Sequence, residues 1–405
     1  MALGIYISVP FCKSKCSYCN FASGVFSRER IQSYVDRLCG DIAATPQLAE
    51  THNGHFESAV DSIYLGGGTP SLLHPRQLEQ VFAAIRHTFD LQPGAEITVE
   101  CAPGTVSDDV LPALVRCGVN RISLGIQSFV DEEARAVGRL HTREVALGDI
   151  ERLRHAGVAN INVDLIAGLP HQTVQSWETS LNIVLETGVP HVSVYMLEVD
   201  EDSRLGREVL AGGVRYHAHF VPDEESTVEF YSRACERLGG AGIVQYEISN
   251  FAGSGMESQH NLKYWLRQPY LGFGVDAHSM LISASHPLEG VRLAWPDSLD
   301  AFTAPARDDR ALQITQIDKA SAWEEVFFLG LRLNRGVDLR IVAALFGRAA
   351  AANAREIIEE LLPSGFVELQ GGLLRLTPAG RLASNEVFER FLHREHAQTV
   401  SSRLA

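Results

Sequence analysis

Tyr6-Ile-Ser-Val-Pro-Phe-Cys12-Lys-Ser-Lys-Cys16-Ser-Tyr-Cys19-Asn20 holds three cysteines at the spacing C-x3-C-x2-C, almost at the start of the chain. The apolar run Ile5 to Val9 comes directly before them and predicts a short buried strand. Three thiols on one loop cannot all form disulfides with one another, because one is left over. They are also one ligand short of a closed tetrahedral zinc site. A [4Fe-4S] cluster normally takes four cysteines, so three would leave one iron open to a ligand that is not protein.

Two other interpretations of the spacing stay open at this point. The three cysteines can be unrelated buried residues, or they can belong to a zinc site whose fourth ligand lies far away in the sequence. The remaining cysteines, Cys39, Cys101, Cys117 and Cys235, are scattered, which is typical of small apolar core residues.

The composition is that of an ordinary water-soluble protein. The chain has 405 residues, 45% of them hydrophobic, a length that fits two or three domains. It contains no apolar run long enough for a membrane span, and its N-terminus lacks a secretory pattern. Reduced cysteines require a reducing compartment, so we expect a cytoplasmic protein. The formal net charge of −15 argues against a nucleic-acid partner, because binding phosphates requires basic patches.

Six apolar segments alternate with segments of helical periodicity over the first 240 residues. The predicted strands are 3–9, 61–65, 96–100, 121–126, 160–166 and 191–197. The first predicted helix, 27–44, ends at Thr45-Pro46, because the residue before a proline avoids the helical region. The alternation predicts an α/β fold with a parallel sheet and right-handed crossovers. Six such units form an incomplete (β/α)6 barrel, and a complete barrel of eight units is the alternative.

Polar residues stand at the carboxyl ends of these predicted strands. In parallel barrels the active site lies at that end, so we expect the side chains to converge there. They are the cysteine loop after the first strand, Gly67, Gly68 and Thr69 after the second, Glu100, Gln127, Asp164 and Glu198. Each of them, taken singly, can equally be a structural polar group with satisfied hydrogen bonds.

Several motifs resemble the coproporphyrinogen oxidase-related branch of the radical S-adenosylmethionine (SAM) family, over nearly the whole chain. In that family SAM chelates the fourth iron of the cluster, and an electron from the cluster cleaves SAM to methionine and a 5′-deoxyadenosyl radical. The motifs that carry the resemblance are Pro10-Phe11-Cys12, Gly66-Gly-Gly-Thr-Pro-Ser71, Ser123-Leu-Gly-Ile-Gln-Ser-Phe129, Asn162-Val-Asp-Leu-Ile-Ala-Gly-Leu-Pro170 and Tyr246-Glu-Ile-Ser-Asn-Phe251.

The resemblance implies a set of cofactor contacts. Cys12, Cys16 and Cys19 would hold the cluster, and Tyr18 would lie near the bound SAM. The planar guanidinium of Arg139 suits the SAM carboxylate. The implied SAM contacts are Tyr6, Gly67, Gly68, Thr69, Glu100, Gln127, Arg139 and Asp164.

The branch contains oxidases and haem chaperones, and two features of this chain favour the chaperones. The oxidases carry a fourth cysteine two residues after the third, where this chain has Phe21, and they carry an N-terminal extension, whereas Tyr6 is nearly the first residue here. The resemblance to the chaperones implies a protein that binds haem and delivers it to respiratory haem proteins. The alternative is a radical SAM oxidoreductase that acts on a tetrapyrrole. Whether the protein is an enzyme therefore stays open.

His260-Asn261-Leu262-Lys263-Tyr264-Trp265 matches the H-N-x-x-Y-W motif of the chaperones. An imidazole can serve as an axial ligand of haem iron, and aromatic faces suit a flat porphyrin. This makes His260 the first haem candidate, and His278 is a second, weaker one. The same residues can instead be a hydrogen-bonded structural histidine and core aromatics.

The C-terminal third predicts an α+β domain that resembles a winged helix. Predicted helices 322–333, 337–346 and 352–362 precede a hairpin at 365–377 with Gly371-Gly372 at its turn, and a last helix spans 382–392. The helix 352–362 carries Glu356, Glu359 and Glu360, which does not suit a helix that lies against phosphates. We therefore expect a lid or docking domain.

These predictions divide the chain into a radical SAM partial barrel (1–240), a connecting segment with the H-N-x-x-Y-W motif (241–310) and the winged-helix-like domain (311–405). The cofactors and cargo implied by the resemblance are a [4Fe-4S] cluster, SAM and haem. The implied partners are an electron donor and recipient respiratory haem proteins, some of them at the membrane surface. The sequence leaves the oligomeric state open, a homodimer included.

Overall fold

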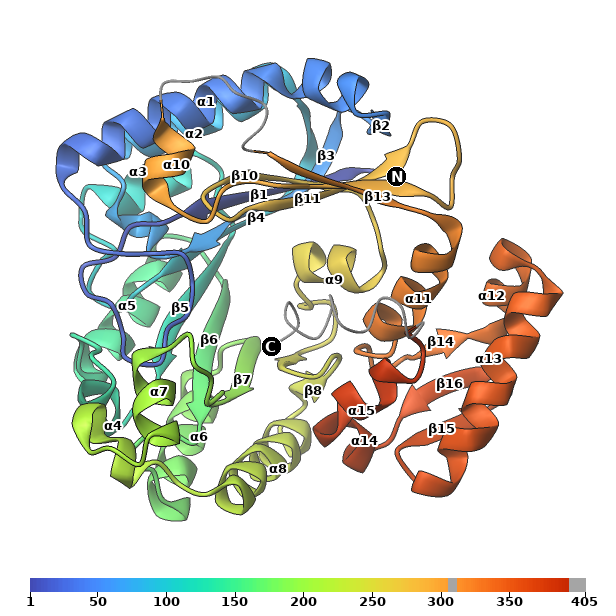
Figure 1. Cartoon of the computed structure of the whole chain (residues 1–405). Coiled ribbons are helices and arrows are strands. Elements are labelled where there is room, and N and C mark those ends of the chain that lie inside the picture. Colours follow the sequence, from blue (N-terminus) through green and yellow to red (C-terminus); the bar gives the residue numbers. More distant parts are fainter. Residues whose placement is uncertain (305–311, 393–405) are drawn as a thin grey trace.

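A computed structural model describes residues 1–304 and 312–392 of the chain. Figure 1 shows a curved sheet wrapped by helices, with a smaller domain of helices and a short sheet beside it. Among the described residues, none of the helices combines the length and the apolar character that crossing a membrane requires.

The six predicted strands form the parallel centre of the main sheet. They are β1 (Leu3–Val9), β3 (Ala59–Gly67), β4 (Asp90–Cys101), β5 (Arg121–Gln127), β6 (Asn160–Ala167) and β7 (His191–Met196), hydrogen-bonded in that order. The helices that connect and cover them are α1 (Arg28–Thr51), α2 (Pro75–Thr88), α3 (Val110–Arg116), α4 (Asp131–Ala136), α5 (Arg143–His155), α6 (Val174–Thr187) and α8 (Glu224–Gly240). The sheet curls into an open barrel, as predicted (Figure 1).

The segments that follow residue 240 do more than connect the two domains, because their strands extend the main sheet at both edges. On one side β10 (Tyr270–Gly274) pairs parallel to β1, and β11 (His278–Ser283), β12 (Gly290–Ala294) and β13 (Gln313–Ile317) continue antiparallel, with β2 (Gly54–His55) paired to β11. On the other side β9 (Asn250–Ala252) pairs antiparallel to β7 and β8 (Val244–Gln245) follows. These strands are short, and no local sequence pattern predicted them.

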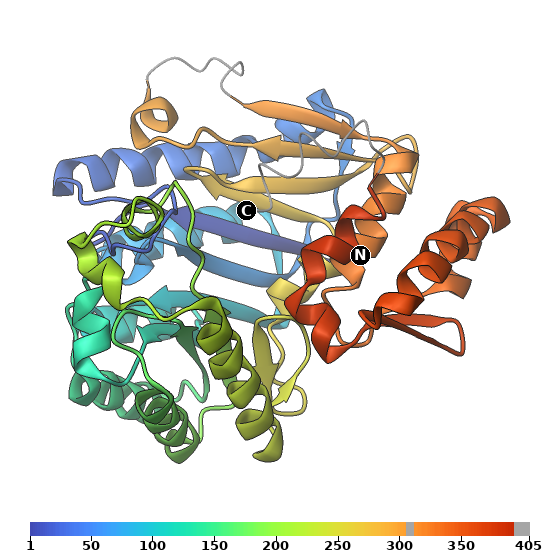
Figure 2. The same ribbon diagram turned by 60° about the horizontal axis from the view of Figure 1, so that its bottom comes forward.

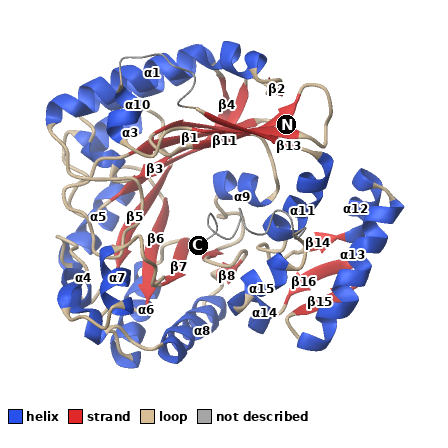
Figure 3. Cartoon of the chain, viewed as in Figure 1, coloured by secondary structure: helices blue, strands red, loops and turns tan. Residues whose placement is uncertain are grey.

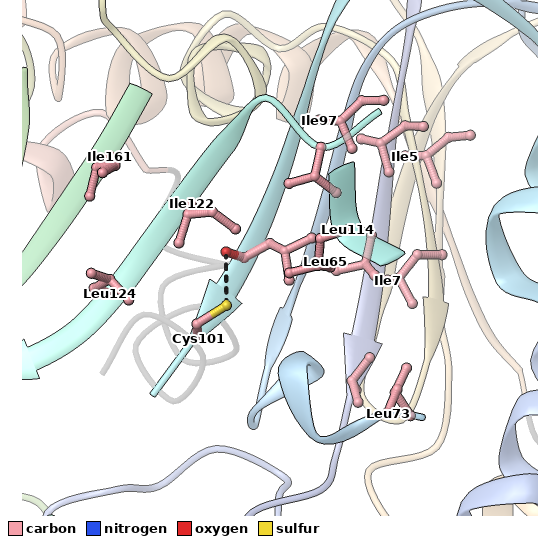
Figure 4. Packing of buried hydrophobic residues seen from close by; sticks show 14 of the residues in the cluster. Ile5, Ile7, Leu65, Leu73, Ile97, Cys101, Leu114, Ile122, Leu124 and Ile161 are labelled. Atoms are coloured by element: carbon pink, nitrogen blue, oxygen red, sulfur yellow. Dashed lines mark hydrogen bonds between the residues drawn. The ribbon is translucent and has the colours of Figure 1, made fainter. Parts of the chain in front are cut away.

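Strand alternation gives the barrel an apolar outer face and a polar inner face. In β1, Leu3, Ile5 and Ile7 are fully buried in the main hydrophobic core, whereas Tyr6 lies on the opposite face. Figure 4 shows the outer layer, in which isoleucine and leucine side chains of neighbouring strands pack together, with Cys101 Sγ 3.9 Å from the carbonyl oxygen of Val99. Packing of the helices on this layer leaves the concave side for polar groups.

The prediction that Pro46 stops the first helix is wrong, because α1 continues to Thr51. Proline removes one backbone donor, and a proline inside a helix costs about 3 kcal/mol. Thr45 Oγ1 donates to Asp41 O over 3.2 Å beside the lost bond. Ile42 and Ala49 are buried on either side of the proline, so packing of the helix on the sheet outweighs the local preference.

Short helices close the two ends of the barrel. α7 (Arg204–Leu210) and the 3-10 segment η2 (Arg215–Phe220) lie at the carboxyl ends of the strands, beside the cysteine loop (Figure 2). α9 (Gln259–Trp265) lies inside the curve of the sheet, toward the other end (Figure 1). We call these two ends the mouth and the floor of the barrel. The remaining short segments are η1 (Pro70–Leu72) and α10 (Leu299–Thr303).

The C-terminal domain has its own core, in which the rings of Phe327 and Phe391 stack with centroids 4.4 Å apart. Its elements are α11 (Lys319–Gly330), β14 (Val337–Asp338), α12 (Leu339–Phe346), α13 (Arg348–Leu361), η4 (Leu362–Ser364), β15 (Val367–Gln370), β16 (Leu373–Leu376), α14 (Pro378–Leu382) and α15 (Ser384–Glu389), and Figure 3 shows the three short strands among the helices. The predicted hairpin is present, with Gly371 and Gly372 at positive φ. The predicted last helix is interrupted at Ala383, where the backbone leaves helical geometry.

Candidate functional site

The cysteine loop leaves β1 at the mouth and is closed at its base. Cys12 N donates to Gly24 O over 2.8 Å, and Gly24 N donates to Pro10 O over 2.8 Å. The base is therefore a short strand-like pairing that holds residues 12–24 as one compact loop. This fixes where the loop begins relative to the barrel.

The glycine-rich turn after β3 packs against the base of the cysteine loop. Gly68 N donates to Val9 O and Thr69 N donates to Phe11 O, each over 2.8 Å. A Cβ atom on Gly68 would stand 2.7 Å from Val9 O, so the approach requires glycine. Thr69 Oγ1 lies 3.9 Å from Cys12 Sγ and can donate to it. The predicted close backbone approach is thus present, and it places Thr69 against the first cysteine.

The three thiols of the loop lie near one another and near polar groups. All three cysteines are free thiols; Cys16 is buried, and Cys12 and Cys19 are half-buried. Burial raises the pKa of the Cys12 thiol, and the nearby Cys19 and Cys16 sulfurs raise it further. Arg139 Nη1 stands 3.6 Å from Cys16 Sγ and donates a hydrogen bond to it.

The described residues offer no ready site for a single metal ion. In the described residues no group of three or more His, Cys, Asp or Glu side chains is arranged to hold a metal ion. The cysteines of a [4Fe-4S] cluster each bind a different iron, so their sulfurs stand farther apart than the ligands of one ion. The described residues therefore give the zinc interpretation no support.

Gln127 and Arg139 present polar atoms that have no protein partner at the mouth. Gln127 Oε1 and Arg139 Nε are buried and make no hydrogen bond, although the guanidinium also donates to Gly125 O. Gln127 is held at a φ of 71°, a left-handed conformation that is rare outside glycine and clusters at functional sites. Buried polar atoms normally have partners. These two fit a polar ligand such as the amino-acid part of SAM.

Glu100 and Asp164 face the interior from neighbouring parts of the sheet. Glu100 accepts from the Tyr64 hydroxyl over 2.8 Å and from Gly67 N over 3.1 Å. Burial, together with the charge of Asp164, raises the pKa of Glu100 to about 7. Asp164 accepts from Ser123 Oγ over 2.9 Å, and burial raises its pKa as well. Glu100 keeps free lone pairs for hydroxyl donors.

The two tyrosines among the predicted contacts lie at different depths. Tyr18 packs in a small apolar cluster at the mouth with Leu205 and Ala218. Tyr6 lies deeper, with its ring centroid 6.1 Å from that of Tyr64 and 6.4 Å from that of His260. Burial raises the pKa of both phenols, so both stay neutral hydrogen-bonding groups. Tyr18 therefore adjoins the cysteines, whereas Tyr6 lines the interior between mouth and floor.

His260 lies at the floor and both of its ring nitrogens have partners. Nδ1 is 3.0 Å from Ser62 Oγ, and Nε2 is 2.8 Å from the Tyr264 hydroxyl. The side chain is fully buried, and burial lowers the pKa of the imidazole to about 3. Coordination of haem iron by His260 would break one of these hydrogen bonds and open the floor. The geometry matches the interpretation of a hydrogen-bonded structural histidine.

Charged side chains hold α9 in place at the floor. Glu96 accepts from the backbone nitrogens of Gln259 and His260 over 3.0 and 3.1 Å, which caps the helix. Lys263 pairs with Asp61 over 2.7 Å and donates to Ala2 O over 2.8 Å. The H-N-x-x-Y-W segment thus fixes α9 to the first strands.

His278, the weaker haem candidate, lies away from both ends. It begins β11, which lies between β10 and β12 in the sheet, and is exposed, with Nε2 3.8 Å from the Asp276 carboxylate. Asp276 takes a φ of 58°. Glu198, predicted at the mouth, follows β7, and burial raises its pKa.

Sequence reasoning missed Arg121, which is 1% exposed in the concave face of the barrel. Its Nη1 lies 3.5 Å from Thr98 Oγ1, and its charge opposes the burial-driven rise in the pKa of Glu100 and Asp164. A charged residue at an inward position of an alternating strand was the available signal. Tyr64, which donates to Glu100, was missed as well.

A pocket of about 240 Å³ lies on the outer side of the cysteine loop. It is lined by Lys13 and Ser14 of that loop, by Thr69 and by Arg139. His141 also lines it, and burial lowers the pKa of that imidazole to about 4. The pocket therefore adjoins the cysteine loop.

Comparisons with known proteins identify the family of the chain. The profile of the radical SAM superfamily matches residues 6–184, and that of the HemN C-terminal domain matches residues 317–383. The chain is 33% identical to the heme chaperone HemW of Bacillus subtilis (strain 168), over 96% of this chain and 98% of that one. It is 29% identical to the heme chaperone HemW of Escherichia coli (strain K12), over 96% and 98%.

The fold resembles a solved structure of a radical SAM enzyme. Coproporphyrinogen III oxidase (HemN) from Escherichia coli superposes with a TM-score of 0.79 at 22% identity, over 96% of this chain and 90% of that one. The shared architecture confirms the predicted fold, a radical SAM partial barrel followed by a smaller C-terminal domain. Radical SAM proteins use a [4Fe-4S] cluster and SAM, which are therefore the cofactors of this chain. With its near full-length similarity to the curated relatives, the chain belongs to the HemW family of radical SAM proteins.

Proposed function

We propose that this protein is a haem chaperone, which binds haem and delivers it to respiratory haem proteins. The observation that carries the proposal is the similarity to heme chaperones along almost the whole chain, the C-terminal domain included. We also propose an electron donor that reduces the cluster, and recipient haem proteins at the membrane surface.

The cofactor sites belong to the same proposal. Cys12, Cys16 and Cys19 hold the cluster, which leaves one iron for SAM. Thr69 and Arg139 stabilise the thiolates, supported by their contacts with the sulfurs of Cys12 and Cys16.

The SAM site lies at the mouth, between the cysteine loop and the ends of the strands. Its support is the pair of unpartnered atoms on Gln127 and Arg139, which need a polar ligand. The other residues of the proposed site are Tyr6, Tyr18, Gly67, Gly68, Thr69, Glu100 and Asp164.

Phe21 favours the chaperone over a coproporphyrinogen-type oxidoreductase. It stands where the oxidases have their fourth cysteine, and its side chain is 64% exposed beside the cysteine loop. An exposed phenylalanine supplies neither a ligand nor a redox group. It does supply an apolar surface of the kind that a porphyrin or a protein partner contacts.

The decisive experiment is an anaerobic haem titration of the reconstituted full-length protein, followed by transfer of the bound haem to a haem-free respiratory cytochrome. We expect one saturable Soret shift per chain and a second shift when the cytochrome takes up the haem. The same preparation is given coproporphyrinogen III and SAM. Decarboxylated product together with an absence of saturable haem binding would overturn the chaperone and establish the oxidoreductase.

A further inference from the structure

Three histidines that the proposed cofactor sites do not use gather at the mouth. His171 follows β6, and His217 and His219 belong to η2. His171 Nε2 and His217 Nδ1 face each other at 3.0 Å. The ring of Phe220 lies between two imidazoles, with centroids 4.1 Å from His171 and 4.0 Å from His219. We call these four residues the histidine patch.

The backbone of the histidine patch is held in an unfavourable conformation. His171, Tyr216 and His217 have φ values of 69°, 55° and 60°. Non-glycine residues in this region cost of order 1 kcal/mol or more each, and such residues cluster at ligand sites. His171 N donates to Phe220 O over 3.0 Å, which fixes the two segments to each other. The fold therefore keeps the two imidazoles hydrogen-bonded to each other, with their ring planes 67° apart, at the expense of local stability.

The segment that carries the histidine patch exposes apolar and cationic side chains. Leu210, Val214 and Phe220 are 59%, 67% and 47% exposed. The guanidinium groups of Arg204 and Arg215 lie 5.3 and 5.6 Å from the centre of the Tyr216 ring. A flat apolar ligand with anionic groups matches this combination.

We propose that the histidine patch is the haem-binding site, with an imidazole of the facing pair as axial ligand, Phe220 against the porphyrin, and Arg204 and Arg215 toward its propionates. This placement rests on the proposed function. Burial and the neighbouring imidazoles lower the pKa of His171, which favours the neutral form that binds iron. Glu132 is the acidic group that acts in the opposite direction.

The donor set favours haem over a free metal ion. The described residues contain no group of three or more His, Cys, Asp or Glu side chains arranged for a metal ion, so an ion at the patch would have only two protein ligands. Haem brings four nitrogen ligands of its own and needs the protein only for axial positions. The exposed apolar side chains would make no favourable contact with a hydrated ion.

The patch is also joined to the cysteine loop. Leu205 N donates to Ser17 O over 2.8 Å, and Arg204 donates to Lys15 O. Tyr18 and Ala218 belong to one apolar cluster with Leu205. Haem at the patch would therefore sit on a segment whose position depends on the loop that holds the iron–sulfur cluster.

The test compares haem binding by the reconstituted wild-type protein and the triple variant His171→Asn/His217→Asn/His219→Asn. Asparagine tolerates positive φ, so the backbone is retained while the imidazoles are removed. The matched control is His155→Asn, an exposed histidine on α5. We expect the triple variant to lose at least tenfold in haem affinity and to lose the electron paramagnetic resonance signature of imidazole-ligated iron, whereas the control keeps both.

Wild-type affinity and spectrum in the triple variant would overturn the placement at the patch. So would their loss in His260→Gln alone, with circular dichroism showing that this variant is folded. In both cases the wild-type protein still binds haem and the proposed function stands. Absence of saturable binding by the wild-type protein would instead overturn the proposed function and, with it, this inference.

Discussion

His260 at the floor of the barrel and Gln127 and Arg139 at the mouth are buried polar groups in opposite states. At the floor, both nitrogens of His260 are hydrogen-bonded and Glu96 caps the helix that carries it. At the mouth, Gln127 and Arg139 each keep a buried atom without a partner, and Phe21 is exposed. A satisfied buried group stabilises the fold, whereas an unsatisfied one costs about 1–3 kcal/mol unless a ligand completes it. The comparison supports the proposal that ligands bind at the mouth and that His260 closes the floor.

The largest expected effect is at the cysteine loop. Cys16→Ala removes one of three cluster ligands, so we expect the reconstituted protein to lose nearly all of its iron and inorganic sulfide. The measurement is iron and sulfide per chain after anaerobic reconstitution. Cys39→Ala, a half-buried cysteine on α1, is the matched control and should retain the cluster. Unchanged iron in Cys16→Ala would contradict the assignment of the loop.

At the floor, we expect a substitution to reduce stability rather than ligand binding. His260→Ala removes two buried hydrogen bonds and leaves Ser62 and Tyr264 without their partner, so we expect unfolding to become easier by about 2–4 kcal/mol. Urea denaturation measures the difference. His278→Ala, an exposed histidine, should change stability by less than about 0.5 kcal/mol. If the two substitutions changed the free energy of unfolding equally, a structural role of His260 would be contradicted.

The comparison of the wild-type protein with His260→Ala also gives a pH test. The pKa of His260 is lowered to about 3 in the folded protein, so between about pH 6.5 and pH 3 the unfolded chain binds more protons than the folded one. Stability contributed by the neutral buried imidazole is present above the unfolded pKa and is lost as pH falls. We expect the stability gap between wild type and His260→Ala to narrow by on the order of 2 kcal/mol between pH 7 and pH 5. A gap that stays constant or widens would show that the imidazole is accessible to protons.

At the mouth the expected effect is on SAM alone. Gln127→Asn keeps the left-handed backbone but withdraws the side-chain oxygen, so we expect SAM to bind about tenfold more weakly with little change in stability. Isothermal titration of the reconstituted protein gives the affinity. Gln175→Asn, on the exposed face of α6, serves as the control. Wild-type affinity in Gln127→Asn would take this residue out of the SAM site.

The smallest effect is expected at Phe21. Phe21→Ser replaces a side chain that is 64% exposed, so the free energy of unfolding should change by less than about 0.5 kcal/mol and the iron content should stay the same. Chemical denaturation and iron analysis measure both. A strong loss of stability would mean that this side chain is packed in the folded protein, contrary to the comparison.

Local sequence patterns were enough to predict the six parallel strands, the cysteine loop at their carboxyl ends and the hairpin of the C-terminal domain. These features follow from local patterns, namely apolar periodicity, cysteine spacing and paired glycines, which act within a few residues of one another. The helix that runs through Pro46 and the strands β8 to β13 depended on tertiary packing and on pairing with distant strands, which no local pattern encodes. The role of His260 and the proposed role of the histidine patch depended most on tertiary structure. Only the folded chain brings Ser62 to His260 and His217 to His171, and a histidine's chemistry is set by the partners of its two nitrogens.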